Sequence, residues 1–164
     1  MKISDILKNN EVTVSFEVFP PKEWSKIEST KAVVAEMAKS NPAFMSVTYG
    51  AAGTRTGFTT EIASAIKDCG VTPLSHLTCL TSTKDKIDTV LDEWKAQGIE
   101  NILALRGDIP KDFEFPSGKH FEHAYELVQV IKEKGGFCVG GACYPEIHPE
   151  SANRAVSYTH LRAH

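Results

Sequence analysis

The segment Val12-Thr13-Val14-Ser15-Phe16-Glu17-Val18-Phe19-Pro20-Pro21-Lys22 decides between the two α/β folds that the sequence allows. Its first part is rich in β-branched and aromatic residues, which predicts a strand over residues 12–19 that ends at Pro20-Pro21. A doubly wound dinucleotide-binding fold needs a glycine-rich turn directly after this strand, because the backbone must approach a pyrophosphate there. The turn contains no glycine, so the sequence favours a barrel.

The rest of the chain continues the alternation of strand and helix. Short apolar runs predict further strands over residues 44–49, 71–80, 102–105 and 137–144. Apolar residues at helical spacing predict helices over residues 24–39, 58–67, from the Ser82-Thr83 cap to Gly98, and 120–134. This alternation is typical of parallel strands joined by right-handed crossovers. We therefore expect one α/β domain, a (β/α)8 TIM barrel truncated to roughly its first five β/α units, with strands that are apolar on both faces.

The composition is that of an ordinary globular protein. Hydrophobic residues make up 41% of the chain, enough for a core, and charged residues make up 24%, so disorder is not indicated. The net charge of -3 disfavours nucleic acid as a partner, and no apolar run is long enough to cross a membrane. The N-terminus lacks the pattern of a secretory signal, and no Cys-x-x-Cys pair occurs. We expect four reduced core cysteines, no metal site and a cytoplasmic protein.

Polar residues recur where the predicted strands end, which is the catalytic rim of a barrel. Glu17 lies in an otherwise apolar strand, and its neighbours Phe16, Val18 and Phe19 predict a buried carboxyl group. Burial disfavours the charged form, so Glu17 is expected to stay protonated near neutral pH and to act as a general acid. Taken singly, the other residues could be a structural histidine, an ion pair or packing residues, but their convergence predicts a site. They are Thr48, Tyr49, His76, Thr78, Arg106, Gly107, Asp108, Tyr144, Glu146 and His148.

Five segments resemble, in the same order, the motifs of the methylenetetrahydrofolate reductase family. They are SFEVFPPK at 15–22, SVTYGA at 46–51, HLTC at 76–79, LALRGD at 103–108 and YPEIHPE at 144–150. The resemblance covers about residues 12–155, and five ordered motifs are jointly specific. It implies a (β/α)8 barrel that holds FAD at its carboxyl rim. It also implies reduction of 5,10-methylenetetrahydrofolate to 5-methyltetrahydrofolate with electrons from NADH or NADPH.

The resemblance implies roles for individual residues. Glu17 resembles the general acid that protonates the bridging nitrogen of the folate, and Asp108 resembles the carboxylate beside the flavin and the folate. Both would therefore contact substrate. Thr48 resembles the residue that contacts the flavin ring and the nicotinamide. The other implied FAD-binding residues are Tyr49, His76, Arg106, Gly107, Asp108, His123, Ala124, Tyr144 and His148.

The resemblance stops near Val156. Residues 1–156 are expected to form the partial catalytic barrel, whereas residues 157–164 resemble translated vector sequence and are expected to lie outside the fold. The full-length parent is expected to be a homo-oligomer. Two alternatives stay open: a catalytically inert fragment of such an enzyme, and a folate-binding barrel that transfers methyl groups using cobalamin. The second predicts pterin-contacting Asp and Asn residues in place of the motif around Glu17. The choice between NADH and NADPH is not decided by the sequence.

Overall fold

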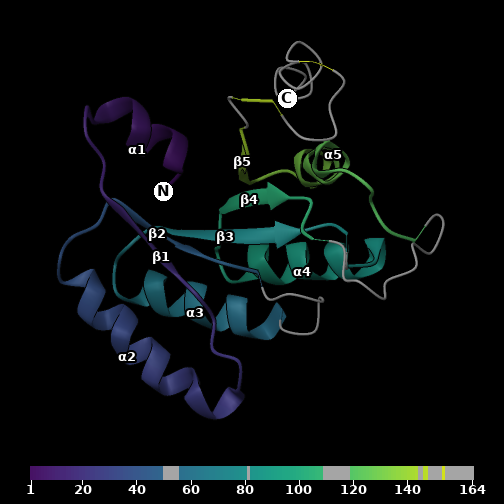
Figure 1. Ribbon diagram of the computed structural model, residues 1–164. Coiled ribbons are helices and arrows are strands. Elements are labelled where there is room, and N and C mark those ends of the chain that lie inside the picture. The colour runs from purple at the N-terminus through teal and green to yellow at the C-terminus, as the bar shows by residue number, and fades with distance from the viewer. Residues whose placement is uncertain (50–55, 81, 109–118, 144–145, 148–152, 154–164) are drawn as a thin grey trace.

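The computed structural model describes residues 1–49, 56–80, 82–108, 119–143, 146–147 and 153 (Figure 1). Two predicted site residues, Tyr144 and His148, lie outside the described residues, and so does the predicted tail at 157–164. A search of the described helices finds none that combines the length and the hydropathy needed to cross a bilayer.

Five parallel strands form one sheet, in the order in which they occur in the chain. Each strand pairs with its neighbour in sequence, so crossovers of one hand all return on the same side of the sheet. A doubly wound sheet would instead reverse its strand order beside the first strand. The predicted fold, a truncated barrel of five β/α units, is confirmed. The strands are β1 (Ser15–Val18), β2 (Phe44–Val47), β3 (Pro73–Thr78), β4 (Asn101–Leu105) and β5 (Cys138–Gly141).

The helices that connect the strands agree with the predicted helices except at one boundary. Residues 120–123 were expected to be helical, but His120 forms an antiparallel bridge with Thr83, and the helix begins at Ala124. Pairing with a distant segment thus overrides the local helical pattern. The connecting helices are α2 (Ile27–Ala38), preceded by the 3-10 turn η1 (Trp24–Lys26), α3 (Thr56–Asp68), α4 (Lys84–Ala96) and α5 (Ala124–Lys134).

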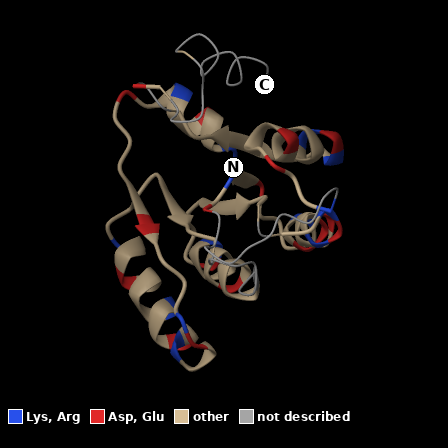
Figure 2. Ribbon diagram, turned by 45° about the vertical axis from the view of Figure 1, so that its right-hand side comes forward, with Lys and Arg blue, Asp and Glu red and all other residues tan. Residues whose placement is uncertain are grey.

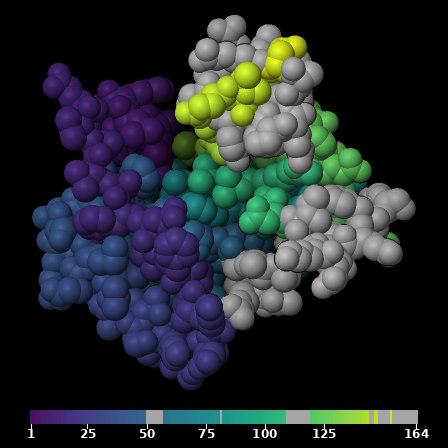
Figure 3. All heavy atoms as spheres, in the orientation of Figure 1, coloured from purple at the N-terminus to yellow at the C-terminus, as the bar shows by residue number. Residues whose placement is uncertain are grey.

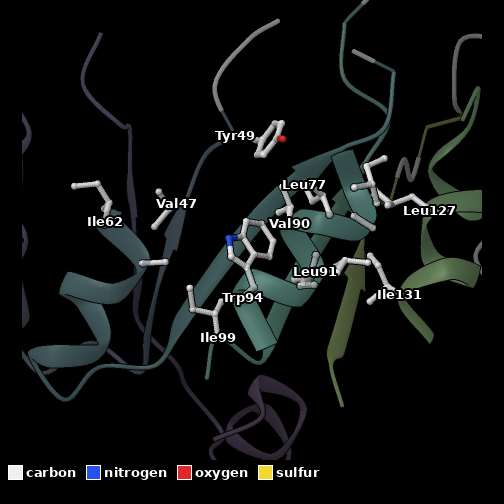
Figure 4. Packing of buried hydrophobic residues seen from close by; sticks show 14 of the residues in the cluster. Val47, Tyr49, Ile62, Leu77, Val90, Leu91, Trp94, Ile99, Leu127 and Ile131 are labelled. Carbon is white, nitrogen blue, oxygen red and sulfur yellow. The ribbon is translucent and has the colours of Figure 1, made fainter. Parts of the chain in front are cut away.

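The hydrophobic core lies between these helices and one face of the sheet. In α4 the buried residues are Ile87, Val90, Leu91 and Trp94, the stripe that the sequence predicts, and Figure 4 shows Trp94 and Leu91 reaching from this helix into the cluster. The strands contribute buried residues at alternate positions, because successive side chains of a strand point to opposite faces. These strand residues are Met45, Val47, Leu77, Ile102 and Ala104.

A short N-terminal helix, α1 (Ile3–Asn9), is present although the sequence reading did not identify it. The backbone N–H of Ile3 donates to Asn101 Oδ1 at 2.8 Å, and Asn101 Nδ2 donates to the carbonyl oxygens of Met1 at 3.0 Å and Pro73 at 3.2 Å. Asn101 and Pro73 begin β4 and β3, so α1 lies at the amino ends of the strands, away from the predicted catalytic rim.

The face of the sheet opposite the helices carries both polar and apolar side chains. Glu17 of β1, Ser46 of β2, and His76 and Thr78 of β3 lie there, at positions that alternate with the core residues. Apolar residues of the strands lie on this face too, as the sequence predicts, so the polar residues are set among apolar ones. These apolar residues are Phe44, Leu74, Leu103 and Leu105. Glu17 is the one Asp, Glu, Lys or Arg within the five strands, and Figure 2 shows the charged residues gathered mainly on the helices and loops. In the space-filling view, teal and green atoms of the central strands are visible at the surface (Figure 3).

All four cysteines are free, but they are not all core residues. Cys79 is fully buried, whereas Cys69 and Cys143 are exposed and Cys138 is half-buried. The expectation of core thiols is therefore wrong for Cys69 and Cys143. Cys69 directly follows the last residue of α3, and Cys143 lies just beyond the end of β5, where fewer neighbours cover the chain.

Candidate active site

Glu17, Ser46 and His76 meet on the face of the sheet opposite the helices, and they come from three adjacent strands. Ser46 Oγ donates a hydrogen bond to Glu17 Oε2 at 3.2 Å. His76 Nε2 lies 3.5 Å from the same carboxylate oxygen. The parallel register explains the first contact, because Glu17 and Ser46 are direct Cα partners across β1 and β2. Both neighbours of Glu17 therefore approach one oxygen, Oε2.

The surroundings of Glu17 differ from those expected from the sequence. Its side chain is 47% exposed, whereas the flanking aromatic and aliphatic residues predicted a buried carboxyl group. The reason is the alternation of a strand: Phe16 and Val18 belong to the opposite face and pack toward the helices, while Glu17 points away from them. β1 is also an edge strand with β2 as its neighbour in the described sheet, so the flank of Glu17 opposite β2 stays open. The expected apolar burial of Glu17 is therefore wrong.

His76 is the most enclosed member of the group. Its side chain is 10% exposed, and burial lowers the pKa of His76 below the ordinary value of 6.5, an effect that the nearby Glu17 carboxylate partly opposes. Near neutral pH the imidazole is therefore neutral. A neutral imidazole with its hydrogen on Nε2 presents a donor to the carboxylate without adding a full positive charge.

Thr48 and Tyr49, which follow β2, have different surroundings. Thr48 is half-buried; its backbone N–H donates to the Val18 carbonyl at 3.1 Å, and its own carbonyl accepts from Thr59 Oγ1 at 3.1 Å. Tyr49 belongs to the hydrophobic core, and its hydroxyl lies 3.4 Å from Ser82 Oγ. The Tyr49 ring thus packs on the helix side of the sheet (Figure 4), so the part of Tyr49 that could meet a cofactor is its backbone.

The segment after β4 carries Arg106, Gly107 and Asp108. Arg106 is half-buried, and its Nε donates to the Glu122 carbonyl at 3.1 Å, which ties the end of β4 to the segment before α5. Gly107 has a φ of +84°, and a Cβ there would lie 3.0 Å from Thr78 Cβ, so glycine is required at this position by the fold itself. Asp108 is exposed at the end of this turn.

The start of α5 holds the last two predicted residues, His123 and Ala124. Ala124 is the first residue of the helix and is half-buried, while His123 is exposed, with its ring centroid 5.7 Å from that of Tyr125. The backbone N–H groups of Glu122 and His123 donate to Glu126 Oε2 at 2.8 and 2.9 Å. The Glu126 carboxylate therefore accepts from two backbone N–H groups that precede the helix and would otherwise lack a partner within it.

The structure thus brings the predicted residues together in two groups. The first is the cluster around Glu17 with His76, and the second is the segment after β4 with the start of α5, joined through Arg106. Ser46 was missed as a site residue, although its spacing of two from Thr48 in a predicted strand places both on one face. Among the described residues, no group of three or more His, Cys, Asp or Glu side chains could hold a metal ion.

A carboxyl group that accepts a hydrogen bond from a hydroxyl, lies beside an imidazole and is half-open to solvent can donate or accept a proton. The site lies in the carboxyl half of parallel strands in a sequentially ordered sheet, which is where barrel enzymes carry their chemistry. Fold and site together define a barrel-type α/β protein in which Glu17, Ser46 and His76 cluster on the face of the sheet opposite the helices.

Comparison with known proteins narrows this class to one family. The family model described as methylenetetrahydrofolate reductase matches residues 2–164, so the chain belongs to the methylenetetrahydrofolate reductase family. It is 40% identical, over 99% of its length, to methylenetetrahydrofolate reductase 2 of Schizosaccharomyces pombe. It is 35% identical over 93% of its length to 5,10-methylenetetrahydrofolate reductase of Escherichia coli, and 37% identical over 92% to methylenetetrahydrofolate reductase (NADH) 1 of Zea mays. The chain spans 50% of the length of the bacterial relative, and 27% and 26% of the yeast and maize relatives.

Proposed function

We propose that this chain carries the acid–base half of a flavin-dependent active site that reduces 5,10-methylenetetrahydrofolate to 5-methyltetrahydrofolate, with NADH or NADPH as reductant. Membership of the family and the names of the relatives support the substrate, and the name of the maize relative specifies NADH. The observation that carries the proposal is the placement of Glu17, the one carboxylate within the five strands, beside Ser46 and His76 on the face of the sheet opposite the helices.

The residues of this face fit a flavin. Leu103 and Leu105 are half-buried on the same face as His76, and they offer an apolar surface for the flat ring system. The hydroxyl of Thr48 and the imidazole of His76 offer polar atoms for the edge of the ring, and the guanidinium of Arg106 suits a pyrophosphate. When bound, FAD supplies the redox chemistry that carries electrons from the nicotinamide to the folate.

The chain's own residues perform the proton chemistry. Glu17, protonated on the oxygen that does not face Ser46, donates this proton to the bridging nitrogen of the folate. The carbon–nitrogen bond of the five-membered ring then breaks, and the resulting iminium carbon accepts a hydride. Asp108, exposed at the rim, is proposed to orient the folate and to set the electrostatic field at the redox centre.

The experiment that tests this function uses the full-length natural protein that carries these residues. It is incubated with methylenetetrahydrofolate and NADH or NADPH, and formation of methyltetrahydrofolate is measured by chromatography. We expect turnover with one or both nucleotides, and a loss of at least about 100-fold in Glu17→Gln. Glu36→Gln, an exposed carboxylate on α2 that pairs with Lys39, is the matched control. A protein without any reductase activity, or a fully active Glu17→Gln variant, would contradict the proposal.

We further propose that the 164-residue chain by itself binds FAD weakly and does not turn over. β1 and β5 each have one strand neighbour in the described sheet, and Glu17 lies on the open flank of β1. The absorbance spectrum of the purified chain tests this directly. A yellow, monomeric chain that oxidises NADH in the presence of the folate would refute it.

A further inference from the structure

We propose that Ser46 is a positioning residue, which acts with His76 to hold Glu17 by Oε2 so that the exchangeable proton resides on Oε1. This inference rests on the proposed function, because it assigns a role to Ser46 within the same acid–base centre. It goes beyond that function by naming a residue that acts on the acid without contacting the redox centre.

The geometry carries the first step of the argument. Ser46 Oγ donates to Glu17 Oε2 at 3.2 Å, and His76 Nε2 lies 3.5 Å from the same oxygen. Both groups can present a hydrogen, so Oε2 is surrounded by donors and is a poor place for the acid's own proton. Both of these contacts of the Glu17 carboxyl group are made through Oε2. A carboxylic acid arranged in this way keeps Oε2 as an acceptor and presents its O–H from Oε1.

Burial carries the second step, because a positioning group must itself be fixed. Ser46 is 8% exposed and lies in the middle of β2, directly opposite Glu17 in the register. Glu17 has a flexible side chain that is 47% exposed, so without Ser46 its carboxyl group could rotate into solvent. The serine therefore anchors the mobile partner to a rigid strand.

The described residues that line the groove beside Glu17 bring no competing charge. On the α2 side, the shallow groove of about 340 Å³ beside Glu17 is lined by Ser29, Thr30, Val33 and Met37, together with Val18 and Phe19, none of which titrates. From β2 the facing group is Ser46, and from β3 it is the imidazole of His76, whose Nε2 lies 3.5 Å from Glu17 Oε2. A change at Ser46 is thus expected to act on Glu17 itself.

The expected effect on the reaction follows from the hydrogen bond. Loss of the Ser46 hydroxyl leaves the flexible Glu17 carboxyl group free to rotate. Because a general acid must be held against its substrate, kcat should fall, while binding of the folate should change little.

The test compares three variants of the full-length natural protein. In Ser46→Ala we expect kcat to fall by roughly tenfold, with KM for the folate changed by less than about twofold and an unchanged flavin absorbance spectrum. Ser46→Thr, which keeps the hydroxyl, should restore most of kcat. Ser75→Ala is the matched control, since Ser75 is a fully buried strand serine on the helix face whose hydroxyl has no hydrogen-bond partner among the described residues.

The outcomes separate this inference from the proposed function. An active natural protein whose Ser46→Ala variant keeps its kcat would overturn the role of Ser46 and leave the function standing. If the natural protein shows no reductase activity, the function fails, and NMR relaxation of the Glu17 side chain decides the inference by itself. We expect this side chain to become more mobile in Ser46→Ala but not in Ser75→Ala; equal mobility in all three proteins would overturn the inference.

Discussion

The indole Nε1–H of Trp94 donates a hydrogen bond of 2.9 Å to Thr60 Oγ1, and this buried contact joins α4 to α3 behind the sheet. Trp94 is fully buried and is the largest such side chain among the described residues. Figure 4 shows it in the middle of the packed cluster, between the residues of α4 and the strands. The two helices are thus joined by a polar contact inside a largely apolar layer.

Replacing Trp94 should therefore be costly for stability. We expect Trp94→Ala to lower the free energy of unfolding by about 3–5 kcal/mol, since it leaves a large cavity and removes the partner of Thr60. Trp94→Phe, which keeps most of the volume but not the N–H, should cost clearly less. Denaturant unfolding followed by circular dichroism measures both, and equal losses in the two variants would contradict the role assigned to packing.

Gly107 is required for a reason that lies in the fold. Alanine there would have to adopt a φ of +84° and would place its Cβ 3.0 Å from Thr78 Cβ. We expect Gly107→Ala to lower the free energy of unfolding by about 1–2 kcal/mol, before any effect on a cofactor. Gly57→Ala, in α3 with open space around the position, is the control and should be neutral or slightly stabilising. A stable Gly107→Ala variant would show that this turn can rearrange.

His76 should make stability depend on pH. Burial lowers the pKa of His76 in the folded protein below the value of 6.5 that applies to the unfolded chain, with Glu17 opposing the shift. Between these two values the unfolded chain binds more protons, so the contribution of His76 is fully present above 6.5 and is lost as the pH falls through the folded-state pKa. Urea unfolding at a series of pH values should show this decline, and His76→Asn should reduce it. His123→Asn, at an exposed position, should keep the full decline. An unchanged decline in His76→Asn would contradict this account.

Cys79 should be the least reactive of the four thiols. Burial raises the pKa of Cys79 to about 11, and its Sγ lies 3.7 Å from the Arg106 carbonyl oxygen, to which it can donate. Since the thiolate is the reactive form, we expect alkylation at neutral pH to modify Cys69 and Cys143 first and Cys79 only after denaturation. Peptide mass spectrometry after timed alkylation measures the order. Early modification of Cys79 in the folded protein would show that the end of β3 opens readily.

The order of strands and helices could be predicted from the sequence, because each element carries its own period of apolar residues. The exact ends of each strand could not be predicted, because they depend on the neighbouring strand with which it pairs. Residues 12–14 have strand character, but the pairing of β1 with β2 extends only from Ser15 to Val18. The helix α1 could not be predicted from its local sequence, because it is stabilised by contacts such as that of Ile3 with Asn101, 98 residues away in sequence.

The residue types of the candidate site could be predicted from the sequence, but the surroundings of each side chain could not. Glu17 was expected to be surrounded by its apolar neighbours in sequence, whereas its spatial neighbours are Ser46 and His76 from adjacent strands. The ring of Tyr49 lies in the core with Val47, two residues earlier, and its contact with a cofactor stays a prediction. For Glu17 and for Tyr49 alike, the period of two along a strand indicates the face on which the side chain lies.

The central claim is that Glu17 supplies a proton to the folate, and the most direct test separates the two halves of the reaction by rapid mixing. In the Glu17→Gln variant of the full-length natural protein, reduction of the bound flavin by NADH or NADPH should proceed at nearly the natural rate, because that step needs no proton from Glu17. Reoxidation of the flavin by methylenetetrahydrofolate should be slowed by at least about 100-fold. Reoxidation of Glu17→Gln at the natural rate would contradict the account.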